Sequence, residues 1–159
     1  SIRKQIGFIA QNVWPLTQSI KEYMLLGLNN ITMDDIENEC KIVNIHDEIM
    51  HMPMKYHTII SETGKNISGG QCQRIMLARM VLLKPRILFL DEASNALDTI
   101  NENKILDYFF KNKCTIVMVT HKLDYIKKCD EIFIMKDGRL FTSGKYDELV
   151  QQWYRNILI

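Results

Sequence analysis

Residues 66–98 of this chain, NISGGQCQRIMLARMVLLKPRILFLDEASNALD, decide its fold. They begin with Ser68-Gly69-Gly70-Gln71, the S-x-x-Q pattern of a capping box, in which a serine hydroxyl and a glutamine side chain satisfy N–H groups at a helix start. We predict a helix from Ser68, because apolar residues then recur at intervals of three and four until Pro85 ends the pattern. The apolar run at residues 87–90 predicts a strand buried on both faces of a parallel sheet.

Polar side chains follow the predicted strands at the points where the strands end. Asp91 and Glu92 come directly after residues 87–90, and His121 follows a β-branched run at residues 115–120. In open α/β sheets the carboxyl ends of the strands are the edge where ligands bind. Taken singly, each signal has a plain structural explanation, since a capping box usually only starts a helix and an acidic pair is usually solvated. Their order favours one shared site.

The stretch resembles the ATP-binding cassette family. Residues 67–71 are similar to its signature motif, residues 87–92 to its Walker B strand with the following glutamate, and residues 94–98 to its D-loop. The resemblance implies an α/β fold, with a mostly parallel sheet of the P-loop NTPase type flanked by helices and an inserted α-helical subdomain. It also implies that residues 12–83 form approximately this helical subdomain, and that residues 1–11 and 84–159 belong to the RecA-like core.

One part of the family pattern is missing from the chain. Nucleotide-binding cassettes hold phosphate in a loop of the form G-x-x-x-x-G-K-[ST], and these 159 residues contain no such sequence. We therefore expect a domain fragment truncated at its N-terminus, with the Walker A loop upstream. Alone, such a fragment is expected to be inactive as an ATPase.

The resemblance also implies a role for each matching residue. ATP and Mg²⁺ are the implied cofactors, and a second nucleotide-binding domain is the implied partner. The implied catalytic residues are Glu92, His121 and Gln11, and Gln11 matches the Q-loop glutamine after a predicted strand at residues 6–10. The implied magnesium ligands are Asp91 and Gln11. The residues implied to act on nucleotide across the dimer are Ser68, Gly69, Gly70, Gln71 and Asp98.

Two further segments indicate an exporter. Residues 52–58 are similar to a loop of peptide (bacteriocin) and type I secretion exporters, although Lys55 stands where these usually have glycine. Residues 58–64 are similar to the exporter X-loop, with Glu62 on its acidic residue and Ser61 replacing its usual glycine. An exporter implies transmembrane domains as partners and a location at the cytoplasmic face of the cell membrane.

Two other functions stay open. A soluble cassette ATPase of DNA repair or translation is one, although repair-type members carry a long coiled-coil insertion where residues 17–60 offer only a compact helical stretch. The other is a non-hydrolysing interaction module that lends its signature motif to a partner's ATP.

Composition limits the possible partners. Twenty basic and nineteen acidic residues leave a net charge of +1, so no overall field attracts nucleic acid or a membrane surface. The four cysteines form no C-x-x-C pair, which favours free thiols in a reducing compartment. Lys84-Pro85-Arg86 interrupts the most apolar stretch, so no segment reaches the roughly 20 apolar residues of a membrane span. We expect a soluble chain without direct lipid insertion.

The remaining segments predict ordinary elements. Ser19 and Thr32 are candidate helix caps, and no strand is predicted in residues 17–60. The spacing of His46, His51 and His57 is too loose for a good metal site, and the neighbouring methionines fit core roles better. A capping box at residues 99–102 predicts another helix, whose apolar face consists of Ile105, Leu106, Phe109 and Phe110. Asp137-Gly138 predicts the turn of a hairpin, and residues 146–153 predict a further helix.

Overall fold

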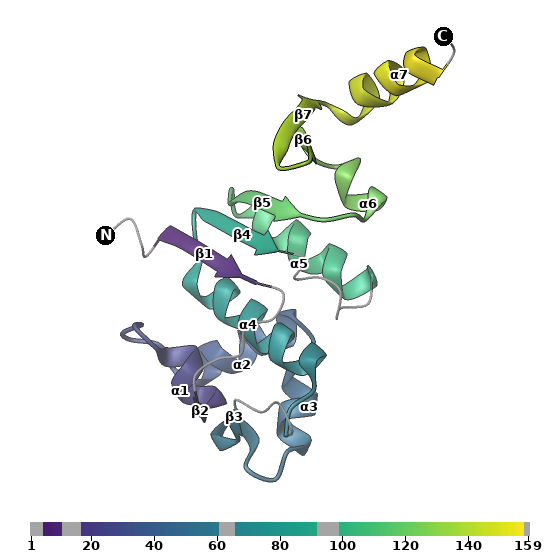
Figure 1. The fold of residues 1–159 in the computed structure, drawn as a ribbon. Coiled ribbons are helices and arrows are strands. Elements are labelled where there is room, and N and C mark those ends of the chain that lie inside the picture. Colours follow the sequence, from purple (N-terminus) through teal and green to yellow (C-terminus); the bar gives the residue numbers. More distant parts are fainter. Residues whose placement is uncertain (1–4, 11–16, 61–65, 92–98, 158–159) are drawn as a thin grey trace. The chain divides into compact units, whose positions relative to one another are not determined.

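A computed structural model describes residues 5–10, 17–60, 66–91 and 99–157, with the side chains of residues 99–104 and 152–157 left aside (Figure 1). The chain divides into two compact units, Ser1–Val119 and Thr120–Ile159.

The first unit contains a three-stranded parallel sheet in the order β1-β4-β5 (Figure 1). Its strands are β1 (Ile6–Ile9), β4 (Ile87–Asp91) and β5 (Thr115–Val119). Phe8 lies opposite Phe89 in the register, and Asp91 lies opposite Val119 at the carboxyl edge. The three predicted strands are therefore confirmed, and they are parallel as the sequence indicated.

Two crossover helices connect these strands. The helix α4 (Gly69–Leu83) leads into β4, and α5 (Thr99–Lys111) connects β4 to β5. Parallel crossovers are right-handed, and both move the chain in the same direction across the sheet, so both helices belong on the same face. The packing is close at Gly7, where an added Cβ would lie 2.8 Å from Met80 Sδ and 2.9 Å from Leu88 Cδ1.

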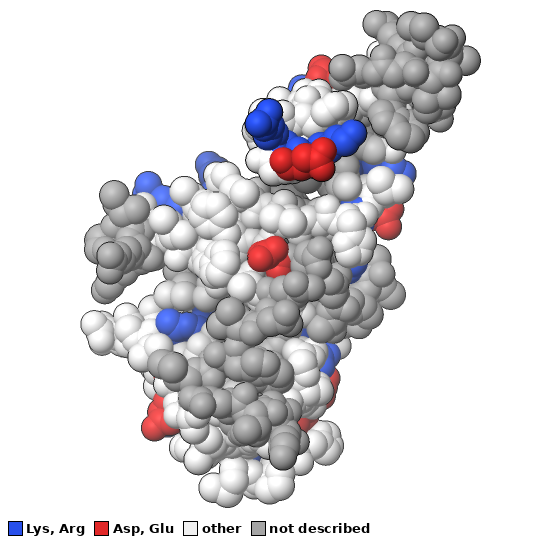
Figure 2. Space-filling view, in the orientation of Figure 1, with Lys and Arg blue, Asp and Glu red and all other residues white. Residues whose placement is uncertain are grey.

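The opposite face of the sheet is exposed. Phe8 is 59% exposed, Val117 47% and Val119 60%, whereas Ile9 and Leu88, which alternate with them, are buried. Figure 2 shows few charged side chains over these strands. The prediction that residues 87–90 are buried on both faces is therefore wrong, because the helices of a sheet that grows in one direction cover only one side.

The helical segment between β1 and α4 contains α1 (Ile20–Leu25), α2 (Met33–Ile42), α3 (His46–His51) and the 3₁₀ turn η2 (Lys55–His57). Ser19 and Thr32 both form full capping boxes, with Glu22 and Asp35 respectively, which confirms the predicted caps. A short antiparallel pair also forms between β2 (Gln18–Ser19) and β3 (Ile59–Ile60), which corrects the prediction of no strands here. Two-residue strands are too short to leave a periodic sequence pattern.

The helices of this segment pack around α4. Nine of its side chains are buried, and eight of these nine are apolar. The helices α1 and α2 contact it and contribute fully buried side chains to one core: Ile20, Met24, Ile36 and Cys40. Lys84 ends α4 in the left-handed conformation, with φ +47°, directly before Pro85. The predicted helix start and stop are both confirmed.

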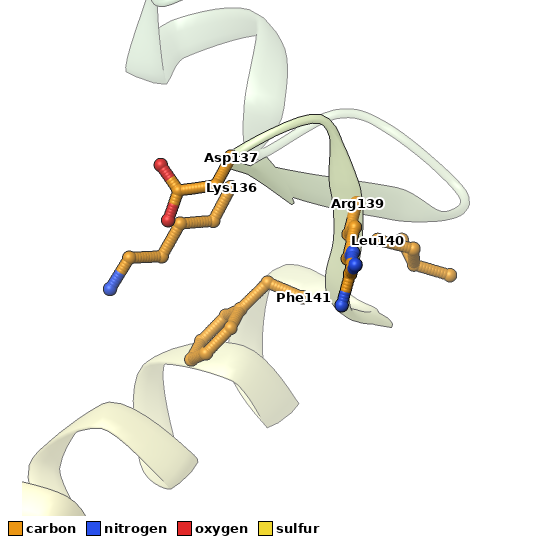
Figure 3. Close-up of a pocket in the computed structure, with 5 residues that line it drawn as sticks. All are labelled: Lys136, Asp137, Arg139, Leu140 and Phe141. Carbon is orange, nitrogen blue, oxygen red and sulfur yellow. The ribbon is translucent and has the colours of Figure 1, made fainter.

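The second unit contains α6 (Leu123–Ile126), β6 (Ile132–Lys136), β7 (Arg139–Gly144) and α7 (Tyr146–Ile157). The strands pair antiparallel through the predicted turn, where Asp137 has φ +50° and Gly138 φ +73°. Residues beside this turn line a shallow hollow, in which the Lys136 ammonium lies 5.7 Å from the centre of the Phe141 ring (Figure 3).

The predicted apolar face of α5 is confirmed at three of its four positions. Ile105, Leu106 and Phe109 are buried on α5 as predicted, but Phe110 is 44% exposed. All four cysteines are free thiols, and three of them are buried. Among the described residues, no helix combines the length and apolar character that crossing a membrane requires.

Candidate functional site

The N-terminus of α4 is held by the predicted capping box. Ser68 has extended backbone angles, and its Oγ accepts from the Gln71 N–H at 3.2 Å. In return, Gln71 Oε1 accepts from the Ser68 N–H at 2.8 Å. The box thus fixes the first turn of the helix.

This arrangement leaves two backbone donors at the helix end. The first N–H groups of an α-helix have no acceptor within the helix, and Gly69 and Gly70 occupy the first two positions of α4. A Cβ added to Gly69 would meet nothing within 4 Å, so the packing of the chain does not require glycine there. The absence of a side chain leaves the backbone open to close approach by another molecule.

A carboxylate on α3 is tied to this helix end. Glu48 Oε2 accepts from Gln71 Nε2 at 3.0 Å and from Arg74 Nη2 at 2.9 Å, and Glu48 Oε1 lies 2.7 Å from Arg74 Nη2. Sequence reasoning missed this cluster. The three-residue spacing of Gln71 and Arg74 places both on one helix face, but it does not say which distant residue they meet.

Farther along α4, Arg79 anchors α1. Its guanidinium donates to the carbonyl oxygens of Tyr23 at 2.8 Å, Met24 at 3.2 Å and Leu26 at 2.8 Å, and lies 5.2 Å from the centre of the Tyr23 ring. These carbonyls lie at the C-terminal end of α1, where the helix leaves acceptors unpaired, although the Tyr23 oxygen also accepts from the Leu26 N–H at 3.3 Å. Burial lowers the pKa of Arg79 and raises the pKa of Tyr23 to about 12.

The histidines of α3 form hydrogen bonds within the helical segment. His46 Nδ1 lies 2.9 Å from the Tyr56 hydroxyl, and His51 Nδ1 lies 2.6 Å from the carbonyl oxygen of Asp47. In the part of the chain that the structure describes, no group of three or more His, Cys, Asp or Glu side chains could hold a metal ion.

Asp91 ends β4, and His121 follows β5 in the sequence. Asp91 is the last residue of β4, is exposed, and lies opposite Val119, the last residue of β5. His121 is exposed, follows Val119 by two residues and belongs to the second unit. Of the other predicted site residues, Gln11, Glu62, Glu92 and Asp98 lie outside the described residues.

The structure therefore brings together Ser68, Gly69, Gly70 and Gln71 at one helix end, as predicted. It places Asp91 at the predicted sheet edge, beside the end of β5. The remaining roles stay predictions.

The family model described as "ABC transporter" matches residues 1–95. An uncharacterized ABC transporter ATP-binding protein of Bacillus subtilis is 37% identical over 158 residues, which is 98% of this chain and 28% of that protein. A putative multidrug export ATP-binding/permease protein of Staphylococcus aureus is 38% identical over 94% of this chain and 26% of its own length.

Among solved structures, a bacterial Atm1-family ABC exporter with ATP bound matches with a TM-score of 0.83 and 29% identity. The match covers 97% of this chain and 28% of the exporter chain. The chain thus spans little more than a quarter of the length of the proteins that it resembles.

Proposed function

Because this chain belongs to the ABC transporter family and is homologous to the nucleotide-binding domains of exporters, we propose that it forms part of the ATPase that powers an exporter. The named relatives support an exporter, since they include a putative multidrug export protein and an Atm1-family exporter. The helical segment supports it too, because α1 to α3 are short helices rather than a long coiled coil.

The observation that carries the proposal is the N-terminus of α4. Two backbone N–H groups without intrahelical acceptors and the positive end of the helix dipole suit an anion. The open space at Gly69 fits a phosphate that approaches the backbone. In the proposed arrangement, Ser68, Gly69, Gly70 and Gln71 face the γ-phosphate of an ATP molecule held by a second nucleotide-binding domain.

The carboxyl edge of the sheet supplies the hydrolytic groups. Asp91 offers an exposed carboxylate oxygen, the ligand type that Mg²⁺ prefers, and with Gln11 it would hold this ion. Bound Mg²⁺ neutralises phosphate charge during transfer. Glu92 takes the proton of the attacking water, a general-base role worth about 10²- to 10⁴-fold in rate. His121 holds the γ-phosphate, Gln11 orients the water, and Asp98 acts across the dimer.

The phosphate-binding loop lies outside the chain in this proposal. The chain lacks the G-x-x-x-x-G-K-[ST] sequence, and within the described residues its parallel sheet grows in one direction, with one apolar face exposed. A segment that winds in the opposite direction would cover this face and create the strand-order reversal at which α/β proteins bind ligands. The chain alone neither binds ATP tightly nor hydrolyses it.

The same proposal gives the partners and the location. The chain works with a second nucleotide-binding domain and with the transmembrane domains of the exporter, at the cytoplasmic face of the membrane. Glu62 faces these transmembrane domains and couples hydrolysis to transport.

The test is Gly69→Asp in the full-length transporter. The structure leaves room for the side chain, so we expect normal folding, whereas a carboxylate close to the phosphate should reduce ATPase activity about tenfold or more. Gly69→Asn is the matched control, because it adds a side chain of similar size to the same open space without the negative charge. Full activity of Gly69→Asp would refute the proposed role of this helix end.

A further inference from the structure

Glu48 lies outside every motif that the sequence indicated, yet it contacts the proposed phosphate-facing turn through two side chains. It belongs to α3, 23 residues before Gln71, and its carboxylate accepts hydrogen bonds from Gln71 Nε2 and Arg74 Nη2. Its side chain is 40% exposed, whereas that of Arg74 is 17% exposed. The contact therefore joins a surface carboxylate to a more buried cation.

The oxygen and the nitrogen of the Gln71 side-chain amide both form hydrogen bonds. Its oxygen accepts from the Ser68 N–H, and its nitrogen donates to Glu48. Because a carboxylate can only accept, Glu48 selects the orientation in which the amide nitrogen points to α3 and the oxygen points to Ser68. The reversed orientation would place two oxygens against each other and would break the capping box.

Arg74 neutralises the negative charge of Glu48 near the N-terminus of α4. An unpaired carboxylate near the N-terminus of α4 would repel an approaching phosphate. The Arg74 guanidinium, 2.7 Å from Glu48 Oε1, neutralises that charge and holds the carboxylate in place. Glu48 can therefore orient Gln71 without adding net negative charge to the site.

We propose that Glu48 is a positioning residue for the phosphate-facing turn: through Gln71 it keeps the Ser68 cap closed and the Gly69 and Gly70 N–H groups directed outward. The inference rests on the proposed function, in which these donors meet the γ-phosphate. It assigns to α3 the task of setting the geometry of the helix end. Glu48 touches no nucleotide in this account and acts only through Gln71.

The test compares three variants in the full-length transporter. Glu48→Ala removes the acceptor for Gln71, whereas Glu48→Gln keeps an oxygen that can accept the same hydrogen bond. Asp47→Asn is the control, because Asp47 shares the first turn of α3 with Glu48 and so makes a similar contribution to the helix dipole. Each variant is assayed for ATPase activity against ATP concentration.

A second readout follows the turn itself. Hydrogen–deuterium exchange of the peptide containing residues 66–71 is measured without nucleotide. Loss of one net hydrogen bond corresponds to a change of about fivefold. We expect Glu48→Ala to speed exchange and to raise KM for ATP by about this factor, with a smaller change in kcat. Glu48→Gln should stay within about twofold of wild type, and Asp47→Asn should change neither quantity.

Either of two results would overturn the inference. Unchanged exchange in Glu48→Ala means that Glu48 does not hold the turn, and an equal KM increase in Asp47→Asn means that only the stability of α3 matters. A wild-type transporter without ATPase activity would instead refute the proposed function. The exchange measurement would still decide whether Glu48 positions the turn, so the two failures are distinguishable.

Discussion

Replacement of Arg79 by methionine tests how α4 holds the helical segment together. Methionine keeps an unbranched apolar side chain against α1 but removes every donor. The variant leaves the carbonyl oxygens of Tyr23, Met24 and Leu26 without the guanidinium that they share in the structure. They lie in the last turn and at the C-cap of α1, where the helix leaves acceptors unpaired, although the Tyr23 oxygen keeps another donor, the Leu26 N–H at 3.3 Å.

The expected loss is about 2–3 kcal/mol of unfolding free energy. One hydrogen bond from a charged donor is worth about 1.5–3 kcal/mol net, and the cation–π contact with Tyr23 adds about 0.5–1 kcal/mol. The three hydrogen bonds share one guanidinium and are not additive, and Leu26 is 50% exposed, so water can replace part of what is lost. The sum therefore stays near the value for one strong hydrogen bond.

Urea denaturation of the complete nucleotide-binding domain measures this loss. Arg86→Met is the matched control, because Arg86 is exposed at the start of β4. Arg79→Lys should fall between wild type and Arg79→Met, since one ammonium cannot reproduce the planar fork of a guanidinium. If Arg79→Met lost no more than Arg86→Met, within about 0.5 kcal/mol, the anchoring role of Arg79 would be wrong.

Two further predictions concern the first unit. Gly7→Ala should destabilise this unit by about 1–3 kcal/mol in thermal unfolding, because the new methyl group would collide with Met80 Sδ and Leu88 Cδ1. A wild-type melting temperature would show instead that α4 can move away. Burial raises the pKa of Tyr23 to about 12 and of Cys40 to about 11, so the folded state binds these protons more tightly than the unfolded state. The stabilisation from these two protonated groups should therefore be fully present below about pH 9 and be lost as the pH rises towards 11 and 12. Tyr23→Phe should lose stability less steeply over this range. Equal slopes for variant and wild type in alkaline urea titrations would contradict this.

Local signals in the sequence were sufficient for the core of the fold. The helix caps at Ser19, Thr32 and Ser68 each depend on residues three positions apart, so local sequence was enough to predict these helix starts. The strand before Asp91 follows in the same way from a short apolar run bounded by Pro85 and an acidic pair.

Features that depend on distant segments could not be predicted in this way. Phe89 belongs to a continuous apolar run, yet it is 37% exposed. The run does not indicate which faces of the sheet the helices cover, so this exposure could not be predicted. The contact of Glu48 with Gln71 and Arg74 requires that α3 fold back onto the start of α4. The site residues Gln11, Glu92 and Asp98 lie outside the described residues, and their roles remain predictions.

In the proposed mechanism, ATP is hydrolysed at the carboxyl edge of β4. The most direct measurement is the ATPase rate of the full-length transporter with Glu92→Gln, together with its ATP binding. Removal of the general base should lower kcat by about 10²-fold or more, while ATP still binds and holds the two nucleotide-binding domains together. A variant that hydrolyses ATP at close to the wild-type rate would contradict the account.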